Sequence, residues 1–158
     1  MTTTAEAAAT ILARFENAWA DLDRTIKSLS ERELTVIRDP AGWAVKDHLV
    51  HLAAWDRALL AGLDGRPRHE ALGLDASTDG SEDWDAMNAA IFAATRDRSL
   101  AEVLDAVRAT QAATRQHLTA LAGGGAATGA EGFLNDAPGY ADHYDQHHGW
   151  IRQLVGCA

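Results

Sequence analysis

Apolar residues recur along most of this chain at the three- and four-residue spacing of an α-helix, and no segment alternates with the two-residue period of a β-strand. Residues 4–29 carry one wide apolar stripe of this kind, and Thr3 and Glu6 stand at capping-box spacing before it. The stripe consists of Ala8, Ile11, Leu12, Phe15, Trp19, Leu22, Ile26 and Leu29. We therefore predict a first helix over residues 4–29.

A second helix is predicted from about residue 44 to residue 63. The turn-forming residues 39–42 precede it, and glycines at its end are typical of helix termination. Residues 30–33 favour a short helical turn between the first two helices. Residues 64–80 are polar and contain glycine, which favours a connection long enough to cross one end of a bundle.

A third helix is predicted over residues 81–121, where Ser81 and the acidic residues after it favour a helix start. The apolar pattern breaks near Asp97. Ser99 and Glu102 follow at capping-box spacing, which indicates a kink or a second helix start.

The last helix is predicted over residues 139–155, after a glycine-rich stretch at 123–132, because Pro138 suits the first turn of a helix. Four such helices in 158 residues are enough for one core. We predict an all-α fold, a four-helix bundle that forms a single domain over residues 1–158.

Charge excludes two classes of partner. The formal net charge is −9, with 14 Lys and Arg against 23 Asp and Glu, so nucleic acid and anionic membrane surfaces would be repelled. A small-molecule substrate is the expected partner. A homodimer through helix faces is compatible with such a bundle, although no residue indicates one.

Cysteine content and the N-terminal residues predict a cytoplasmic protein. The single cysteine, Cys157, cannot form an intramolecular disulfide, which suits a reducing compartment. Residues 1–13 lack the basic start of a signal peptide, and no apolar run approaches the length that spans a bilayer.

Histidines on the second and last helices are the main candidates for chemistry. His143 and His147 lie one turn apart on the same side as Trp150, so the pair should point into the bundle. Two imidazoles at this spacing can bind one ion, and either His48 or His51 could supply a third ligand from the facing helix. Alternatively, the pair consists of hydrogen-bonded core histidines or stacks on Trp150.

The segment Gly42-Trp-Ala-Val-Lys-Asp-His-Leu-Val-His-Leu-Ala-Ala-Trp-Asp56 resembles the second-helix signature of the DinB/YfiT-like superfamily. That superfamily includes thiol-dependent transferases and mycothiol-dependent maleylpyruvate isomerases. The resemblance places the first metal ligand on His51 and not on His48, and the other two on His143 and His147. It implies a divalent transition metal, and zinc or nickel suits imidazole ligands.

Residues 83–91 and 96–100 resemble the ClbS/DfsB branch of this superfamily, in which metal ligands are not universal. The resemblance therefore leaves both a metalloenzyme and a metal-free protein open.

Four further residues are candidates for a pocket around the histidines. Trp55 and Trp150 lie near the predicted site and could form its walls. Asp56 falls on the inward side of the second helix; it either orients a ligand or acts as a base, or, as we favour, pairs with an arginine of a neighbouring helix. Asn88 could contact substrate or water, or could bind a backbone carbonyl.

The leading functional hypothesis is a small metalloenzyme with three histidine ligands and open coordination positions. The resemblance implies transfer or isomerisation with a low-molecular-weight thiol as cofactor, or hydrolytic detoxification of a reactive small molecule. Arg57, Arg96 and Arg98 are candidates to bind the carboxylates of a thiol cofactor. The alternative is a metal-free binding or resistance protein of the ClbS/DfsB type.

Overall fold

The computed structural model describes residues 2–156, so Cys157 lies outside the described residues. The helices are α1 (Thr4–Ser28), α2 (Glu31–Thr35), α3 (Val45–Leu63), α4 (Arg68–Leu72), the 3-10 turn η1 (Ala76–Thr78), α5 (Trp84–Thr95), α6 (Leu100–Ala122) and α7 (Ala130–Leu154). Residues 2–156 contain no strand beyond an isolated bridge between Arg38 and Ala44, which confirms the all-α prediction. Among the described helices, none is long and apolar enough to cross a membrane.

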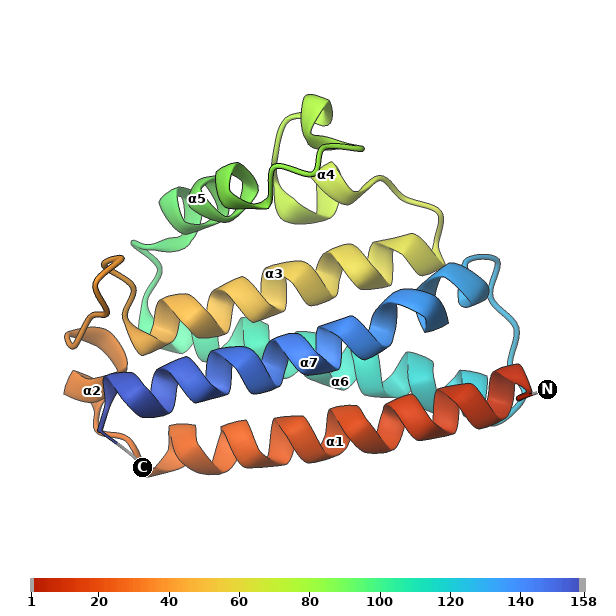
Figure 1. Cartoon of the computed structure of the whole chain (residues 1–158), viewed down its shortest axis with the longest axis horizontal. Helices are drawn as coiled ribbons and strands as arrows, with labels where there is room; N and C mark the ends of the chain where they lie inside the picture. Colours follow the sequence, from red (N-terminus) through yellow and green to blue (C-terminus); the bar gives the residue numbers. More distant parts are fainter. Residues whose placement is uncertain (1, 157–158) are drawn as a thin grey trace.

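Four long helices form the predicted bundle. Both α1 and α3 pack against α6 and α7, so the helices follow the cyclic order α1, α6, α3, α7. Figure 1 shows that α1 and α7 run in one direction and that α3 and α6 run in the other. The parallel pair α3 and α6 arises because residues 64–99 lead the chain back alongside α3 before α6 begins.

The outer side of α3 is covered by α4 and α5, so 16 of its 19 residues are buried (Figure 1). A second apolar cluster fills this layer, apart from the main core of the bundle; its buried members are Ala54, Trp55, Ala58, Leu72, Met87 and Ile91. The break predicted near Asp97 is a second helix start, and α5 lies outside the four-helix bundle. The predicted connection over 64–80 contains α4 and η1, because Leu72 is buried against α3.

The predicted start of the last helix is wrong. We expected it at residue 139, but α7 begins at Ala130 and contains Pro138 in its interior. Proline disfavours a helix interior because it lacks an N–H group. Burial of Phe133 and Ala137 in the main core offsets that loss, and both residues precede the proline.

Candidate metal centre

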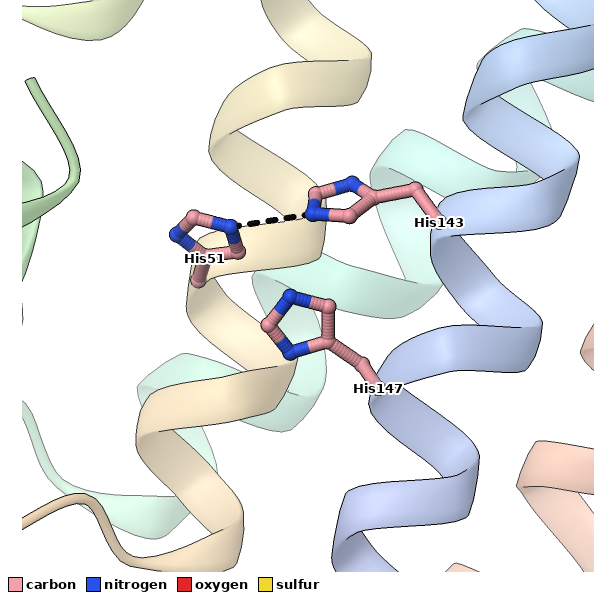
Figure 2. A group of neighbouring side chains, drawn as sticks. All are labelled: His51, His143 and His147. Carbon is pink, nitrogen blue, oxygen red and sulfur yellow. Dashed lines mark hydrogen bonds between the residues drawn. The ribbon is translucent and has the colours of Figure 1, made fainter. Parts of the chain in front are cut away.

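Three imidazole rings meet between α3 and α7. His51 comes from α3, whereas His143 and His147 lie one turn apart on α7, and their rings face one another (Figure 2). One ligand atom from each of the three lies within 4.8 Å of the others. The distance from Nε2 of His51 to Nε2 of His143 is 3.1 Å. The predicted trio is therefore brought together, and it could hold a metal ion.

The ring nitrogens fit the spacing that a small divalent ion requires. Nitrogen ligands of a tetrahedral site with bonds of about 2.0–2.1 Å lie about 3.3 Å apart. The 3.1 Å separation of Nε2 of His51 and Nε2 of His143 is close to this value, and the ligand atom of His147 lies within 4.8 Å of both. Three protein ligands leave further coordination positions open, as in catalytic zinc sites.

A relay of side chains fixes the tautomer of His147. Nε2 of His48 lies 3.0 Å from Oδ2 of Asp39, and Nδ1 of His48 lies 2.9 Å from Nδ1 of His147. Because a carboxylate only accepts, Nε2 of His48 donates to it, and Nδ1 of a neutral His48 then accepts from Nδ1 of His147. The lone pair of His147 is left on Nε2, the nitrogen that faces His51 and His143 (Figure 2).

Asp39 is positioned by the turn that precedes α3. Its Oδ1 accepts the backbone N–H of Trp43 at 2.9 Å, and its carbonyl accepts the N–H of Gly42 at 2.9 Å. Gly42 has a φ of 87°, a conformation that glycine adopts without strain. The turn therefore holds the carboxylate at the end of the relay.

His51 has no such relay. Its Nδ1 is buried and has no hydrogen-bond partner among the described residues.

The buried rings stay neutral well below neutral pH. Burial, reinforced by the neighbouring imidazoles His143 and His48, lowers the pKa of His51 to about 3. Burial lowers the pKa of His143 to about 4. The pKa of His147 is lowered even further, by burial first and then by the three other imidazoles. Neutral imidazoles offer the lone pairs that a metal ion needs.

Two cavities of similar size meet at the histidines. The Trp84 cavity, of about 790 Å³, is lined by residues of α3, α5 and α7 that include Trp55, Trp84 and Tyr140. The Trp43 cavity, of about 780 Å³, is lined by residues that include Trp43, His51 and His147. His143 and Asn88 line both cavities, so the cluster is open to small molecules from two sides.

Three of the four predicted pocket residues line these cavities, whereas Asp56 lines neither. Trp55 lines the Trp84 cavity, and its Nε1–H donates to Oδ1 of Asn88 at 3.1 Å. The partner of Asn88 is thus an indole and not a backbone carbonyl. Trp150 lines the Trp43 cavity with its ring centroid 4.7 Å from that of His147. Its side of α7 was expected to be buried, but 44% of Trp150 is exposed, because that side borders a cavity.

Asp56 has a different partner from the one we favoured. It is buried, as predicted, but its Oδ2 accepts the hydroxyl of Tyr144 at 2.5 Å, and no arginine pairs with it among the described residues. Burial raises the pKa of Asp56 to about 7, although the Tyr144 hydrogen bond opposes this. A carboxyl group with a pKa of about 7 is about half protonated at neutral pH, so it carries less charge for a cation to balance.

The arginines that we predicted to bind a cofactor line neither cavity. The guanidinium of Arg96 lies over Phe92, and Arg57 is half-buried near Arg98. The arginines that do line the cavities are Arg66 and Arg68 in the Trp84 cavity and Arg38 in the Trp43 cavity.

The residues that sequence analysis missed are His48, Asp39 and Trp43. His48 was considered as a ligand only, and residues 39–42 were considered only as a turn. Trp43 stacks on Phe92 and has its ring centroid 5.1 Å from that of His51. Trp43 stands near the start of the segment that resembles the second-helix signature of the DinB/YfiT-like superfamily, and this position was the one sequence signal that could have pointed to it.

A family model described as the DinB superfamily matches residues 14–151. This chain belongs to the DinB superfamily. The matched range contains the three converging histidines and all of α3, as expected for a DinB-like helical bundle. No curated protein and no solved structure matches the chain, so the ClbS/DfsB branch of the DinB superfamily stays a prediction.

Proposed function

We propose that this DinB-superfamily protein is a metal-dependent enzyme in which His51, His143 and His147 bind a divalent zinc or nickel ion. One observation carries the proposal: one ligand atom from each of the three imidazoles lies within 4.8 Å of the others, at a point between two cavities. Neutral, buried imidazoles from two different helices match the ligand set of a catalytic site with open positions.

The hydrogen bonds around His147 support this proposal. Metal-bound histidines commonly donate their second N–H to a carboxylate or another acceptor, which orients the ring and raises its basicity. Here Nδ1 of His147 donates to His48, which in turn donates to Asp39. An orientation that leaves Nε2 facing two other imidazoles suits a ligand better than a core histidine.

A bound ion would supply Lewis acidity and lower the pKa of a coordinated thiol or water. Two cavities that meet at His143 favour a reaction of two substrates, so we propose transfer with a low-molecular-weight thiol rather than hydrolysis. Titration of the cobalt-substituted protein with N-acetylcysteine tests this choice. A sulfur-to-cobalt charge-transfer band is expected for thiol coordination, and its absence would favour hydrolysis.

Metal analysis of protein purified without a histidine tag tests the metal site itself. We expect about one zinc or nickel ion per chain in the wild type and a loss of the ion in His147→Ala and His143→Gln. His117→Ala is the matched control, because His117 is exposed on α6, away from the cluster, and should leave the content unchanged. Thermal melting of each variant separates loss of the ion from loss of the fold.

The competing function is a metal-free binding protein of the ClbS/DfsB type. The bond between His51 and His143 favours it, because the rings can satisfy each other without an ion. A wild type that takes up no metal, and whose melting temperature does not change when zinc is added, would overturn the metalloenzyme proposal in favour of this one.

The pH dependence of metal binding should follow the buried rings. Free imidazole has a pKa near 6.5, which would predict weaker binding below that pH. Because burial lowers the pKa of His51 to about 3 and that of His143 to about 4, we expect binding to persist at pH 5 to 6. Equilibrium dialysis with zinc at a series of pH values measures this.

A further inference from the structure

The Trp84 cavity combines cationic and aromatic residues in a strongly acidic chain. Its charged lining residues are two arginines, Arg66 and Arg68, and one carboxylate, Asp136. The chain as a whole carries a formal charge of −9. Arg66 pairs with Asp64 at 3.7 Å, which leaves Arg68 as the lining cation without a salt bridge among the described residues. Arg68 is therefore the place in this cavity that favours an anionic ligand.

Arg68 is held by hydrogen bonds and makes no salt bridge within residues 2–156, although the charge of Asp79 acts on it. Its Nη2 donates to the carbonyl oxygens of Thr78 at 2.8 Å and Ser81 at 3.2 Å. Its Nε is buried without a hydrogen-bond partner in the part of the chain that the structure describes. A partly buried guanidinium with an unpaired N–H is costly unless an acceptor completes it. The two carbonyls therefore position a cation that keeps one N–H without a hydrogen-bond acceptor among the described residues.

Aromatic surface lies beside this cation. Trp84 is 49% exposed although it lines a cavity, and the Arg68 guanidinium carbon stands 5.3 Å from the centroid of its ring. The ring of Trp55 lies 5.6 Å from that of Trp84. Trp84 therefore supplies most of the exposed flat apolar surface for a planar ligand, and Trp55, which is 6% exposed, lies beside it.

Two glycines keep the cavity open along α7. Gly132 and Gly139 both line it, and a Cβ added at either position would meet nothing within 4 Å. Glycine inside a helix costs up to about 1 kcal/mol relative to alanine. Packing does not require glycine at these two positions, and their missing side chains leave room for a ligand.

We infer that the Trp84 cavity binds a small organic anion, with a carboxylate at Arg68 and a planar apolar body against Trp84 and Trp55. His143 also lines this cavity, so a ligand there would lie beside the proposed metal site. Its role as a substrate rests on the proposed function, whereas anion binding by Arg68 does not depend on a metal.

Binding of benzoate and of its neutral counterpart benzamide to chelator-treated, ¹⁵N-labelled protein tests this inference. The indole N–H signals in NMR spectra report binding, and Trp84→Phe identifies the Trp84 signal. We expect benzoate to shift the Trp84 and Trp55 signals with a dissociation constant at least about tenfold lower than that of benzamide, from a charge-assisted hydrogen bond.

Two pairs of variants make this test specific. Arg68→Gln keeps donors for the two carbonyls but removes the charge, so it should abolish the preference for benzoate; Arg108→Gln, exposed on α6, should not. Gly139→Leu should fill the cavity and abolish binding of both probes. Gly149→Leu, on an exposed part of the same helix, should leave binding intact.

Equal binding of the two probes, or a preference for benzoate that survives Arg68→Gln, would overturn the inference. Benzoate binding that appears only after zinc is added would also overturn it, because the metal would then be the anion site, while the proposed function would stand. Arg68-dependent binding in a protein that takes up no metal would support the inference although the proposed function had failed.

Discussion

The tautomer of His147 is set by His48, which it contacts, and by Asp39, which contacts His48 but not His147. His48 accepts from its Nδ1, and Asp39 sets the direction of that bond from the far side of His48. Asp39 in turn is fixed by backbone groups of the turn before α3. The orientation of a candidate ligand on α7 thus depends on a loop nearly 110 residues earlier in the sequence.

We expect His48→Ala and Asp39→Asn to weaken metal binding about 10- to 100-fold, the usual cost of losing such an outer partner. Competition with a chromophoric chelator measures the affinity. His69→Ala is a matched control, because His69 forms a similar pair with Asp79 at 2.6 Å but takes no part in the cluster. Unchanged affinity in His48→Ala would show that the relay does not act on the ion.

Asp56 should make stability depend on pH. Its pKa is about 7 in the folded protein, above the ordinary value of 3.8, so the folded state holds a proton that the unfolded state releases between these values. The contribution of Asp56 to stability therefore falls as pH rises from about 4 to 7 and stays low above 7. At about 1.4 kcal/mol per pKa unit, the full change is on the order of a few kcal/mol.

Asp56→Asn isolates this effect, because an amide can still accept the Tyr144 hydroxyl but does not titrate. The buried histidines oppose Asp56: their pKa values are lowered, so their contribution is lost as pH falls below about 6.5. The useful quantity is thus the difference between wild type and variant in urea unfolding. We expect the free energy of unfolding of the wild type to fall relative to that of Asp56→Asn as pH rises from 4 to 7. A difference that stays constant with pH would contradict the prediction.

Helix starts differ in how far local sequence controls them. Thr3 with Glu6 and Ser99 with Glu102 form the capping boxes that their spacing predicts. Those bonds join residues three positions apart, so no distant contact is needed. The start of α7 has no side-chain cap; instead, the N–H of Gly129 donates to the carbonyl of Leu63 at 3.3 Å, at the end of α3.

Gly129→Ala should therefore destabilise the protein. A Cβ at Gly129 would lie 2.2 Å from the carbonyl oxygen of Gly62, so the backbones of α3 and α7 would have to separate. We expect a loss of about 1–3 kcal/mol, typical of overpacking, in urea unfolding. Gly132→Ala, one turn further along α7, meets nothing within 4 Å and should be neutral or slightly stabilising. Similar effects of both changes would contradict the close approach.

The whole molecule has a main core inside the bundle and a second apolar cluster between α3 and the α4–α5 layer. The histidine cluster bridges α3 and α7, and its rings lie against Trp43 and Trp150. Both cores bury their apolar side chains without a metal, so an ion would add a cross-link between two helices that these cores already hold together.

We accordingly expect chelator-treated protein to remain folded, with a cooperative thermal transition. Zinc at about 100 times its dissociation constant should add about 2.7 kcal/mol, which corresponds to a rise of several degrees in melting temperature. Circular dichroism measures both, and His143→Gln should abolish the rise but not the fold. Unfolding on chelation would mean that the ion is needed for folding itself.

Sequence alone determined the all-α class, the four bundle helices, two capped helix starts and the pairing of His143 with His147. Each follows from the spacing of residues within one helix, which backbone geometry fixes locally. Resemblance to the DinB/YfiT-like superfamily added His51. The tertiary structure decided the partner of Asp56, the His48–Asp39 relay, the start of α7 and the arginines that line the cavities. These depend on how separate helices and loops pack against one another, and the positions of residues along a single helix do not encode those distances.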